Sequence, residues 1–226
     1  MYFQSVTFDL DGTLLDTIAD LAEACRLMLD EIGAPARSLA EVHRFVGKGM
    51  AVLVERCLTR GQPPTTEKLA QAIAVFERHY AAVNGQFTQI YPGVLEGLKA
   101  WQASGLKMGV VTNKPAQFTE VLLDRMGLAD YFAVIVSGDT TAHKKPHPEP
   151  VLHACRMLNV RPERNLHIGD SKHDIAAAHA AGCIAYGVPY GYNEGGPVDS
   201  ADCDALVSDL LVAYRQALTF KYRPDK

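Results

Sequence analysis

The spacing of apolar residues divides the chain into two parts of different character. Between residues 16 and about 87, apolar side chains recur at three- and four-residue steps, first from Ile18 to Ile32, where Gly33 and Pro35 end the pattern. Further helical stretches are expected at about 38–46, 49–60 and 66–84. Because no convincing strand interrupts them, we predict that residues 16–87 form an all-helical insert.

The flanking segments alternate short apolar runs with helical ones. Strands are predicted at 6–8, 108–111, 133–136, 166–168 and 184–188, and helices at 95–103, 117–126, 150–158 and 175–181. This alternation indicates an α/β fold with a doubly wound, Rossmann-like parallel sheet, in which ligands bind at the carboxyl ends of the strands. Residues 1–15 and 88–226 would form the α/β domain, and residues 16–87 a small helical domain inserted into it.

Composition narrows the class of protein and of partner. The 226-residue chain is 48% apolar and 21% charged, which is ordinary for a globular protein and excludes the signature of disorder. Its net charge is -4 and its basic residues are scattered, so it has no basic footprint for nucleic acid and no polybasic membrane anchor. We expect a small-molecule ligand, no nucleic-acid or membrane partner, and a monomer or homodimer.

Cysteine usage and sorting signals predict a cytoplasmic location. The five cysteines are odd in number and none lies in a CxxC pair, as expected for reduced thiols. No run of about 18 apolar residues and no signal segment occurs. Residues 2–5 (Tyr-Phe-Gln-Ser) read like the end of an engineered protease-cleavage site, so residues 1–5 are treated as partly tag-derived and excluded from functional reasoning.

Polar side chains follow three of the predicted strands at the points where these strands end. Asp9 and Asp11 follow the first strand, Thr112 and Asn113 the second, and Asp170 a later one. Because the carboxyl ends of parallel strands meet at one edge of a sheet, we expect these groups to lie close together.

Carboxylates gathered in this way require a cation. Asp174, on the first turn of the helix after Asp170, adds a fourth carboxylate, and Lys145 is a candidate counter-charge in the segment 143–148, whose prolines fix the local chain. A hard cation such as Mg²⁺ takes oxygen ligands and keeps waters for a substrate phosphate. The pattern therefore predicts a magnesium site that receives a phosphate group.

Four segments in order resemble the motifs of the haloacid dehalogenase-like hydrolase superfamily. They are DLDGTL at 9–14, Thr112-Asn113, KPHP at 145–148 and GDSKHD at 169–174. The helical insert directly after the first motif is similar to the small helical cap of that superfamily, type C1. Within the group, segments 144–148, 189–193 and 46–49 look most like phosphoglycolate phosphatases.

The resemblance implies a magnesium-dependent phosphatase that acts on a small phosphomonoester. The first candidate substrate is 2-phosphoglycolate. Asp9 would attack phosphorus and form an aspartyl phosphate, and Asp11 would act as general acid and then as general base. Mg²⁺ would be held by Asp9, Asp170 and the backbone carbonyl of Asp11. Asp174 would complete the metal site by orienting Lys145 or a metal-bound water.

The same resemblance gives roles to the remaining polar positions. Thr112 would hydrogen-bond a phosphoryl oxygen, and Lys145 would neutralise charge on the phosphoryl group and on Asp9. Thr13 and Asn113 are expected to bind substrate. Lys48, between two glycines in the insert, would reach the substrate's carboxylate.

Plainer interpretations stay open at several of these positions. Thr112 and Asn113 could cap a helix, Asp174 could favour the positive end of its helix, and Lys48 could lie on a surface loop. Lys144 is interpreted as a solvated neighbour of Lys145.

Other functions compete with phosphoglycolate hydrolysis. Pyrophosphate, nucleotides and sugar phosphates remain possible substrates. A phosphomutase of the same fold is disfavoured, because such enzymes carry a cap-side histidine where this chain has Leu21 and its neighbours. A dehalogenase is disfavoured because Asp11 supplies an acid that such enzymes lack at this place. A catalytically silent binding module is disfavoured because burying charges that have no function is costly.

Overall fold

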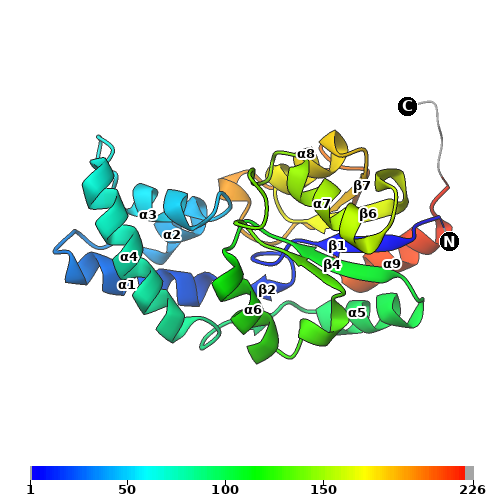
Figure 1. Ribbon diagram of the computed structural model, residues 1–226, viewed down its shortest axis with the longest axis horizontal. Coiled ribbons are helices and arrows are strands. Elements are labelled where there is room, and N and C mark those ends of the chain that lie inside the picture. The colour runs from blue at the N-terminus through cyan, green and yellow to red at the C-terminus, as the bar shows by residue number, and fades with distance from the viewer. Residues whose placement is uncertain (1, 222–226) are drawn as a thin grey trace.

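A six-stranded parallel sheet forms the centre of the molecule in the computed structural model, which describes residues 2–221 (Figure 1). The strands lie in the order β5 (Val134–Val136), β4 (Lys107–Val111), β1 (Ser5–Phe8), β6 (Asn165–Gly169), β7 (Ile184–Gly187) and β8 (Ala205–Leu206). The two middle strands, β1 and β6, are buried along their whole length, as their apolar runs require. The α/β class predicted from the sequence is confirmed.

Helices cover both faces of this sheet (Figure 1). One face carries α5 (Val94–Ala103), α6 (Ala116–Arg125) and α9 (Leu210–Thr219), and the other carries α7 (Glu149–Leu158) and α8 (Lys172–Ala180). Three short 3₁₀ turns, η1 (Ala129–Tyr131), η2 (Pro162–Arg164) and η3 (Asn193–Gly195), connect elements. Each face has its own buried cluster. Phe8, Leu98 and Trp101 belong to the cluster on the side of α5, and Val151, Ala154 and Ile175 to the cluster on the side of α7 and α8.

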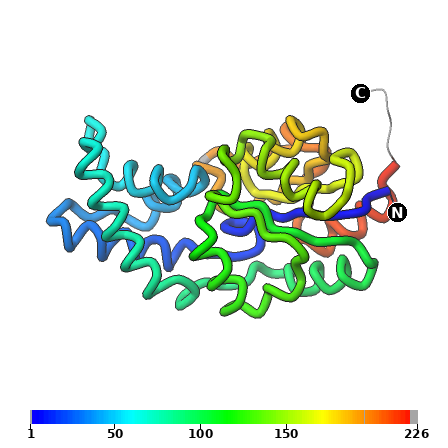
Figure 2. Tube along the Cα trace, viewed as in Figure 1, coloured from blue at the N-terminus to red at the C-terminus, as the bar shows by residue number. Residues whose placement is uncertain are grey.

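The four helices predicted between residues 16 and 87 are present beside one end of the sheet. They are α1 (Ile18–Glu31), α2 (Leu39–Phe45), α3 (Met50–Leu58) and α4 (Thr66–Val83), and we call them the helical unit. Met28, Leu53 and Phe76 belong to a buried cluster formed mainly by these helices. Figure 2 shows that the unit lies at the end of the molecule opposite the N-terminus.

The chain passes between the two parts at a pair of short strands that the sequence pattern did not predict. Strand β2 (Leu15–Asp16) leaves the core and pairs antiparallel with β3 (Gln89–Ile90), which returns to it. Next to this pair, the buried carboxylate of Asp20 accepts hydrogen bonds from Gly85 N at 2.8 Å, from Phe87 N at 2.7 Å and from the Thr88 hydroxyl. The start of α1 and the returning segment are therefore joined.

The described part of the N-terminal segment packs into the fold. Phe3 is buried in the core, and Ser5 opens β1, where its hydroxyl donates to Asn165 Oδ1 at 2.8 Å. These residues were excluded from functional reasoning and carry none of the site, but they help to build the sheet. Met1 and residues 222–226, which the sequence analysis assigned to the α/β domain, lie outside the described residues.

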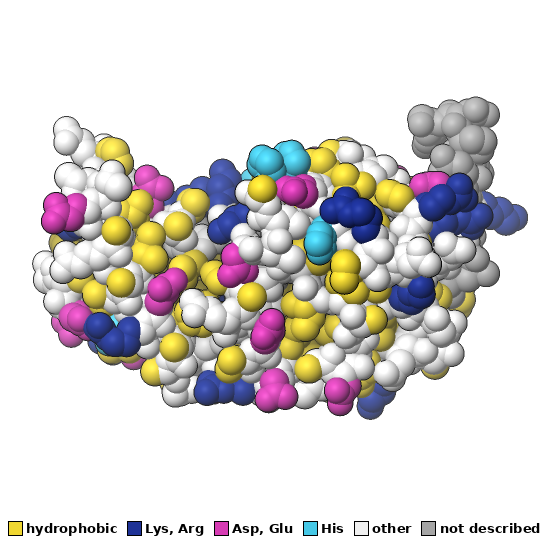
Figure 3. Space-filling model, in the orientation of Figure 1, with side chains coloured by type: hydrophobic (Ala, Val, Ile, Leu, Met, Phe, Trp, Pro, Cys, Tyr) yellow, Lys and Arg dark blue, Asp and Glu magenta, His cyan; other side chains and the backbone are white. Residues whose placement is uncertain are grey.

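Within residues 2–221, no helix combines the length and the apolar character needed to cross a membrane. Acidic and basic side chains are interspersed on the face in Figure 3.

Candidate active site

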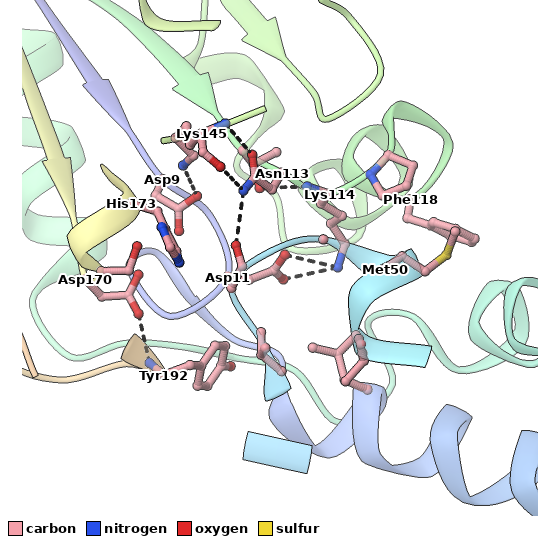
Figure 4. Close-up of a pocket in the computed structure, with 18 of the residues that line it drawn as sticks. Asp9, Asp11, Met50, Asn113, Lys114, Phe118, Lys145, Asp170, His173 and Tyr192 are labelled. Carbon is pink, nitrogen blue, oxygen red and sulfur yellow. Dashed lines mark hydrogen bonds and ion pairs between the residues drawn. The ribbon is translucent and has the colours of Figure 1, made fainter. Parts of the chain in front are cut away.

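The ends of three neighbouring strands bring polar side chains into one cavity. Asp9 follows β1, Thr112 follows β4 and Asp170 follows β6 directly, and β1 lies between the other two strands. All three side chains line a cavity of about 60 Å³ between the sheet edge and the helical unit (Figure 4). The meeting of these groups at one edge, predicted from the strand pattern, is observed.

Asp170 is held by the loops that follow β1 and β7. Thr13 Oγ1 donates to Asp170 Oδ1 at 3.0 Å, and the backbone N of Tyr192 donates to Oδ2 at 2.8 Å. Gly12 and Gly191 have φ angles of +97° and +95°, and a Cβ on either would lie 2.4 or 2.3 Å from Asp170 Oδ2. Only glycine combines that backbone angle with so close an approach. Thr13, which was predicted to bind substrate, is placed on Asp170 instead of being free in the cavity.

Lys145 lies between two of the carboxylates. Its Nζ donates to Asp9 Oδ1 at 2.6 Å, to Asp174 Oδ1 at 2.5 Å and to the carbonyl oxygen of Val111 at 2.6 Å. The amide of Asn113 clamps the Lys145 backbone, because its Oδ1 accepts from Lys145 N and its Nδ2 donates to Lys145 O, both at 3.0 Å. Asn113, also predicted to bind substrate, therefore positions the loop that carries the lysine.

Asp174 is bound on both oxygens. Besides Lys145 on Oδ1, Ser171 donates to Oδ2 from its backbone N at 3.1 Å and from its hydroxyl at 2.5 Å, and the pair forms the capping box of α8. Burial opposes ionisation and is the largest single influence, but the charge and hydrogen bond of Lys145 together with the contact from His167 outweigh it and lower the pKa of Asp174. Asp174 thus stabilises a helix start and orients Lys145 at the same time.

The other two carboxyls have raised pKa values. Burial raises the pKa of Asp9 well above its usual value, partly offset by Lys145, and burial together with the charge of Asp174 raises the pKa of Asp170 to about 7. Asp9, Asp170 and Asp174 each offer an oxygen, and these oxygens lie within 4.8 Å of one another. Lys145 alone does not balance three buried carboxylates, so this all-oxygen donor set fits a divalent cation such as Mg²⁺.

Asp11 points away from this cluster. Its Oδ1 accepts from Thr17 Oγ1 at 2.8 Å, and Lys114 Nζ lies 3.1 and 3.4 Å from its two oxygens (Figure 4). The ammonium of Lys114 also bonds the Tyr80 hydroxyl and lies 4.6 Å from the centroid of that ring. The Lys114 side chain is only 4% exposed. Sequence reasoning missed Lys114, although it directly follows the Thr112-Asn113 pair.

Thr112 has a local hydrogen bond inside the cavity wall. Its Oγ1 accepts from the backbone N of Lys114 at 3.2 Å, and the residue is buried. This is a turn contact and not the helix cap that the sequence left open, because the N-cap residue of α6 is Pro115. The contact fixes the turn that places Lys114 beside Asp11.

Lys48 lies at the rim of the cavity. Gly47 and Gly49 line the cavity, while Lys48 Nζ is 3.7 Å from Glu194 Oε2 and the side chain is 44% exposed. Glu194, in η3, also pairs with Arg56 Nη1 of α3 at 2.5 Å and contacts His173 Nε2 of α8 at 2.6 Å. Glu194 therefore connects the helical unit to the core, and no sequence pattern indicated this contact.

Comparison with known proteins assigns the family. The family model described as haloacid dehalogenase-like hydrolase matches residues 6–188, so this chain belongs to that family. The chain is 47% identical over 212 residues to a phosphoglycolate phosphatase from Thiobacillus denitrificans, with 93% of each protein covered. It is 38% identical over 231 residues to one from Escherichia coli K12, covering 93% of this chain and 92% of the relative. The chain is a phosphoric monoester hydrolase.

Solved structures agree with this assignment. A crystal structure of a predicted phosphoglycolate phosphatase from Haemophilus somnus 129pt superposes with a TM-score of 0.90 at 31% identity, covering 96% of this chain and 99% of the other. A β-phosphoglucomutase from Clostridium difficile superposes with a TM-score of 0.76 at 20% identity, covering 96% of this chain and 100% of the other. The second likeness establishes only a shared fold.

Proposed function

We propose that this chain is a magnesium-dependent phosphatase that hydrolyses 2-phosphoglycolate through an aspartyl phosphate on Asp9. The observation that carries the proposal is the buried carboxylate of Asp9, held by Lys145 at 2.6 Å beside Asp170 and Asp174. The relatives that bear the name phosphoglycolate phosphatase over more than nine tenths of this chain favour that substrate.

The carboxylate of Asp9 attacks phosphorus, and the bond from phosphorus to the ester oxygen breaks. Asp11 gives its proton to the leaving alkoxide, then takes a proton from the water that attacks the aspartyl phosphate, which releases inorganic phosphate and restores Asp9. Lys145 neutralises charge on Asp9 and on the phosphoryl group, and Asn113 keeps Lys145 in place. Thr112 offers its hydroxyl to a phosphoryl oxygen.

Asp9, Asp170 and the backbone carbonyl of Asp11 would hold the Mg²⁺ ion. When bound, the ion offsets the repulsion between the carboxylate nucleophile and the anionic phosphate. Asp174 fits the orienting role better than that of a ligand, since both of its oxygens already accept hydrogen bonds. Thr13 supports the metal site through Asp170.

Residues 16–87 act in this proposal as a cap over the α/β domain of residues 1–15 and 88–226. Val46, Met50 and Leu53 of the helical unit line the cavity opposite the carboxylates. An apolar wall excludes water from the reacting group and strengthens the electrostatic interactions inside the cavity.

The size of the cavity favours a small substrate over a nucleotide. Its volume of about 60 Å³ is well below the roughly 300–1,000 Å³ of pockets that hold larger ligands. A phosphomutase activity finds no support at the start of α1, because Asp20 is engaged with the returning segment and Leu21 is apolar.

A panel of phosphomonoesters and pyrophosphate, assayed with MgCl₂, tests the proposal. We expect the highest kcat/KM with 2-phosphoglycolate, and release of inorganic phosphate in place of an isomerised sugar phosphate. If another substrate is hydrolysed at least tenfold more efficiently, the substrate is wrong while the reaction class stands. Asp9→Asn, which preserves the shape of the side chain, is the control for contaminating phosphatases.

A further inference from the structure

We propose that Lys114 binds the carboxylate of the substrate, and that it does so by exchanging the Asp11 carboxylate for it. This inference rests on the proposed function and names the residue that gives that function its preference for an acidic substrate. The contacts of the two lysines in the cavity carry it.

The two lysines serve different ends of the cavity. Among the described residues that line it, the ammonium groups belong to Lys145 and Lys114. All three hydrogen bonds of the Lys145 ammonium go to groups of the core at the phosphoryl end, namely Asp9, Asp174 and Val111. Lys114 lies on the other side of Asp11, toward Met50 and Phe118 (Figure 4). It is therefore the cation available to the part of the substrate that is not phosphate.

Burial makes an anionic partner necessary for Lys114. Its side chain is 4% exposed, and Tyr80 supplies only a hydroxyl and a ring face. An ammonium removed from water needs a negative charge close to it, and Asp11 fills that place at 3.1 Å. A carboxylate from the substrate meets the same requirement.

Asp11 can give up Lys114 without losing every partner. The hydroxyl of Thr17 donates to Asp11 Oδ1 at 2.8 Å, independently of Lys114. When a substrate carboxylate binds the lysine, Asp11 is released from its ion pair and can turn toward the leaving oxygen. With a proton taken up from water, Asp11 is then in place to act as the general acid.

The covalent structure of phosphoglycolate agrees with this arrangement. A single methylene separates the ester oxygen from the carboxylate carbon. A general acid that protonates this oxygen must therefore have the carboxylate-binding group as a near neighbour, and Lys114 contacts Asp11 directly. Lys48 instead pairs at the rim with Glu194.

The test compares two substrates that differ only at the group in question. The first is 2-phosphoglycolate and the second is 2-hydroxyethyl phosphate, in which an uncharged hydroxymethyl group replaces the carboxylate. Wild type should prefer phosphoglycolate by at least tenfold in kcat/KM. In Lys114→Met this preference should fall by about ten- to a hundredfold, the worth of one charge-assisted hydrogen bond. Lys144→Met, which removes an exposed ammonium nearby, should keep the preference.

Each outcome separates this inference from the proposed function. Equal losses on both substrates in Lys114→Met, or a wild type with less than threefold preference for the carboxylate, would overturn the role of Lys114 and leave the phosphatase standing. A wild type that hydrolyses neither substrate would overturn the proposed function itself. Lys114→Gln, whose amide can still hydrogen-bond Tyr80 and Asp11, repeats the comparison if the Met variant does not fold.

Discussion

The α/β core and the helical unit contribute to the cavity in different ways. From the core come carboxylates and a lysine that are fixed by hydrogen bonds to the ends of strands and to the loops around them, as Asp170 and Lys145 show. From the helical unit come mostly apolar side chains, together with Tyr80. In the proposed function the core would therefore carry out the reaction, while the junction with the helical unit would determine which substrate fits.

Substitution of the nucleophile should have the largest effect on the core side of this comparison. In Asp9→Asn the amide is a poor nucleophile, so kcat should fall by at least about a thousandfold for every substrate. Acid-stable, base-labile labelling of the protein by phosphate should disappear as well. If the variant still forms the labelled intermediate, Asp9 is not the nucleophile.

Removal of the metal should have the next largest effect. Buried carboxylates that face an anionic phosphate need a cation, so EDTA should abolish at least about 99% of the activity and MgCl₂ should restore it. Binding of Mg²⁺ to the native state should also raise the melting temperature of the substrate-free protein, measured by calorimetry. Full activity in the chelator would show that hydrolysis does not require magnesium.

The connection between the two regions, which we call the joint, consists of the β2–β3 pair and the hydrogen bonds of Asp20. It can be weakened by a substitution that does not change the cavity. In Asp20→Asn one acceptor oxygen becomes an NH₂ group that faces a backbone donor, either Gly85 N or Phe87 N. The free energy of unfolding should fall by about 1–3 kcal/mol, measured by urea denaturation. An unchanged unfolding free energy would show that the β2–β3 pair alone holds the joint.

Substitution at the rim should have the smallest effect. Lys48→Ala removes a half-exposed ion pair with Glu194, so kcat/KM should fall by less than about fivefold, and equally for phosphoglycolate and 2-hydroxyethyl phosphate. A loss confined to phosphoglycolate would instead support the substrate contact predicted for Lys48 from the sequence.

The sequence was informative where side-chain direction follows from a regular element. An apolar run followed by aspartate is enough to place Asp9 and Asp170 at the edge of a parallel sheet, because strand direction and sheet order bring those ends together. The helix α9 was missed although its signal is present, with Asp209 as N-cap and Leu210, Ala213 and Ala217 on the buried side.

The side-chain contacts of residues in irregular segments could not be predicted from the sequence. The direction of Lys114 depends on a turn fixed by Thr112, and its partner Tyr80 lies in another part of the fold. Lys48 lies between two glycines, and this pattern could not reveal Glu194 as a partner. Neither contact leaves a periodic trace in the sequence.

The paired crossing at β2 and β3 has a consequence for how such a protein changes over evolutionary time. Since the chain leaves and rejoins the core through adjacent strands, the segment between them can be lengthened, shortened or replaced while both attachment points stay where they are. The strand ends that carry Asp9 and Asp170 would stay unchanged when this segment changes. A lineage can thus reshape the wall that the inserted segment gives to the cavity by exchanging one continuous stretch of the gene, and keep its inherited chemistry intact.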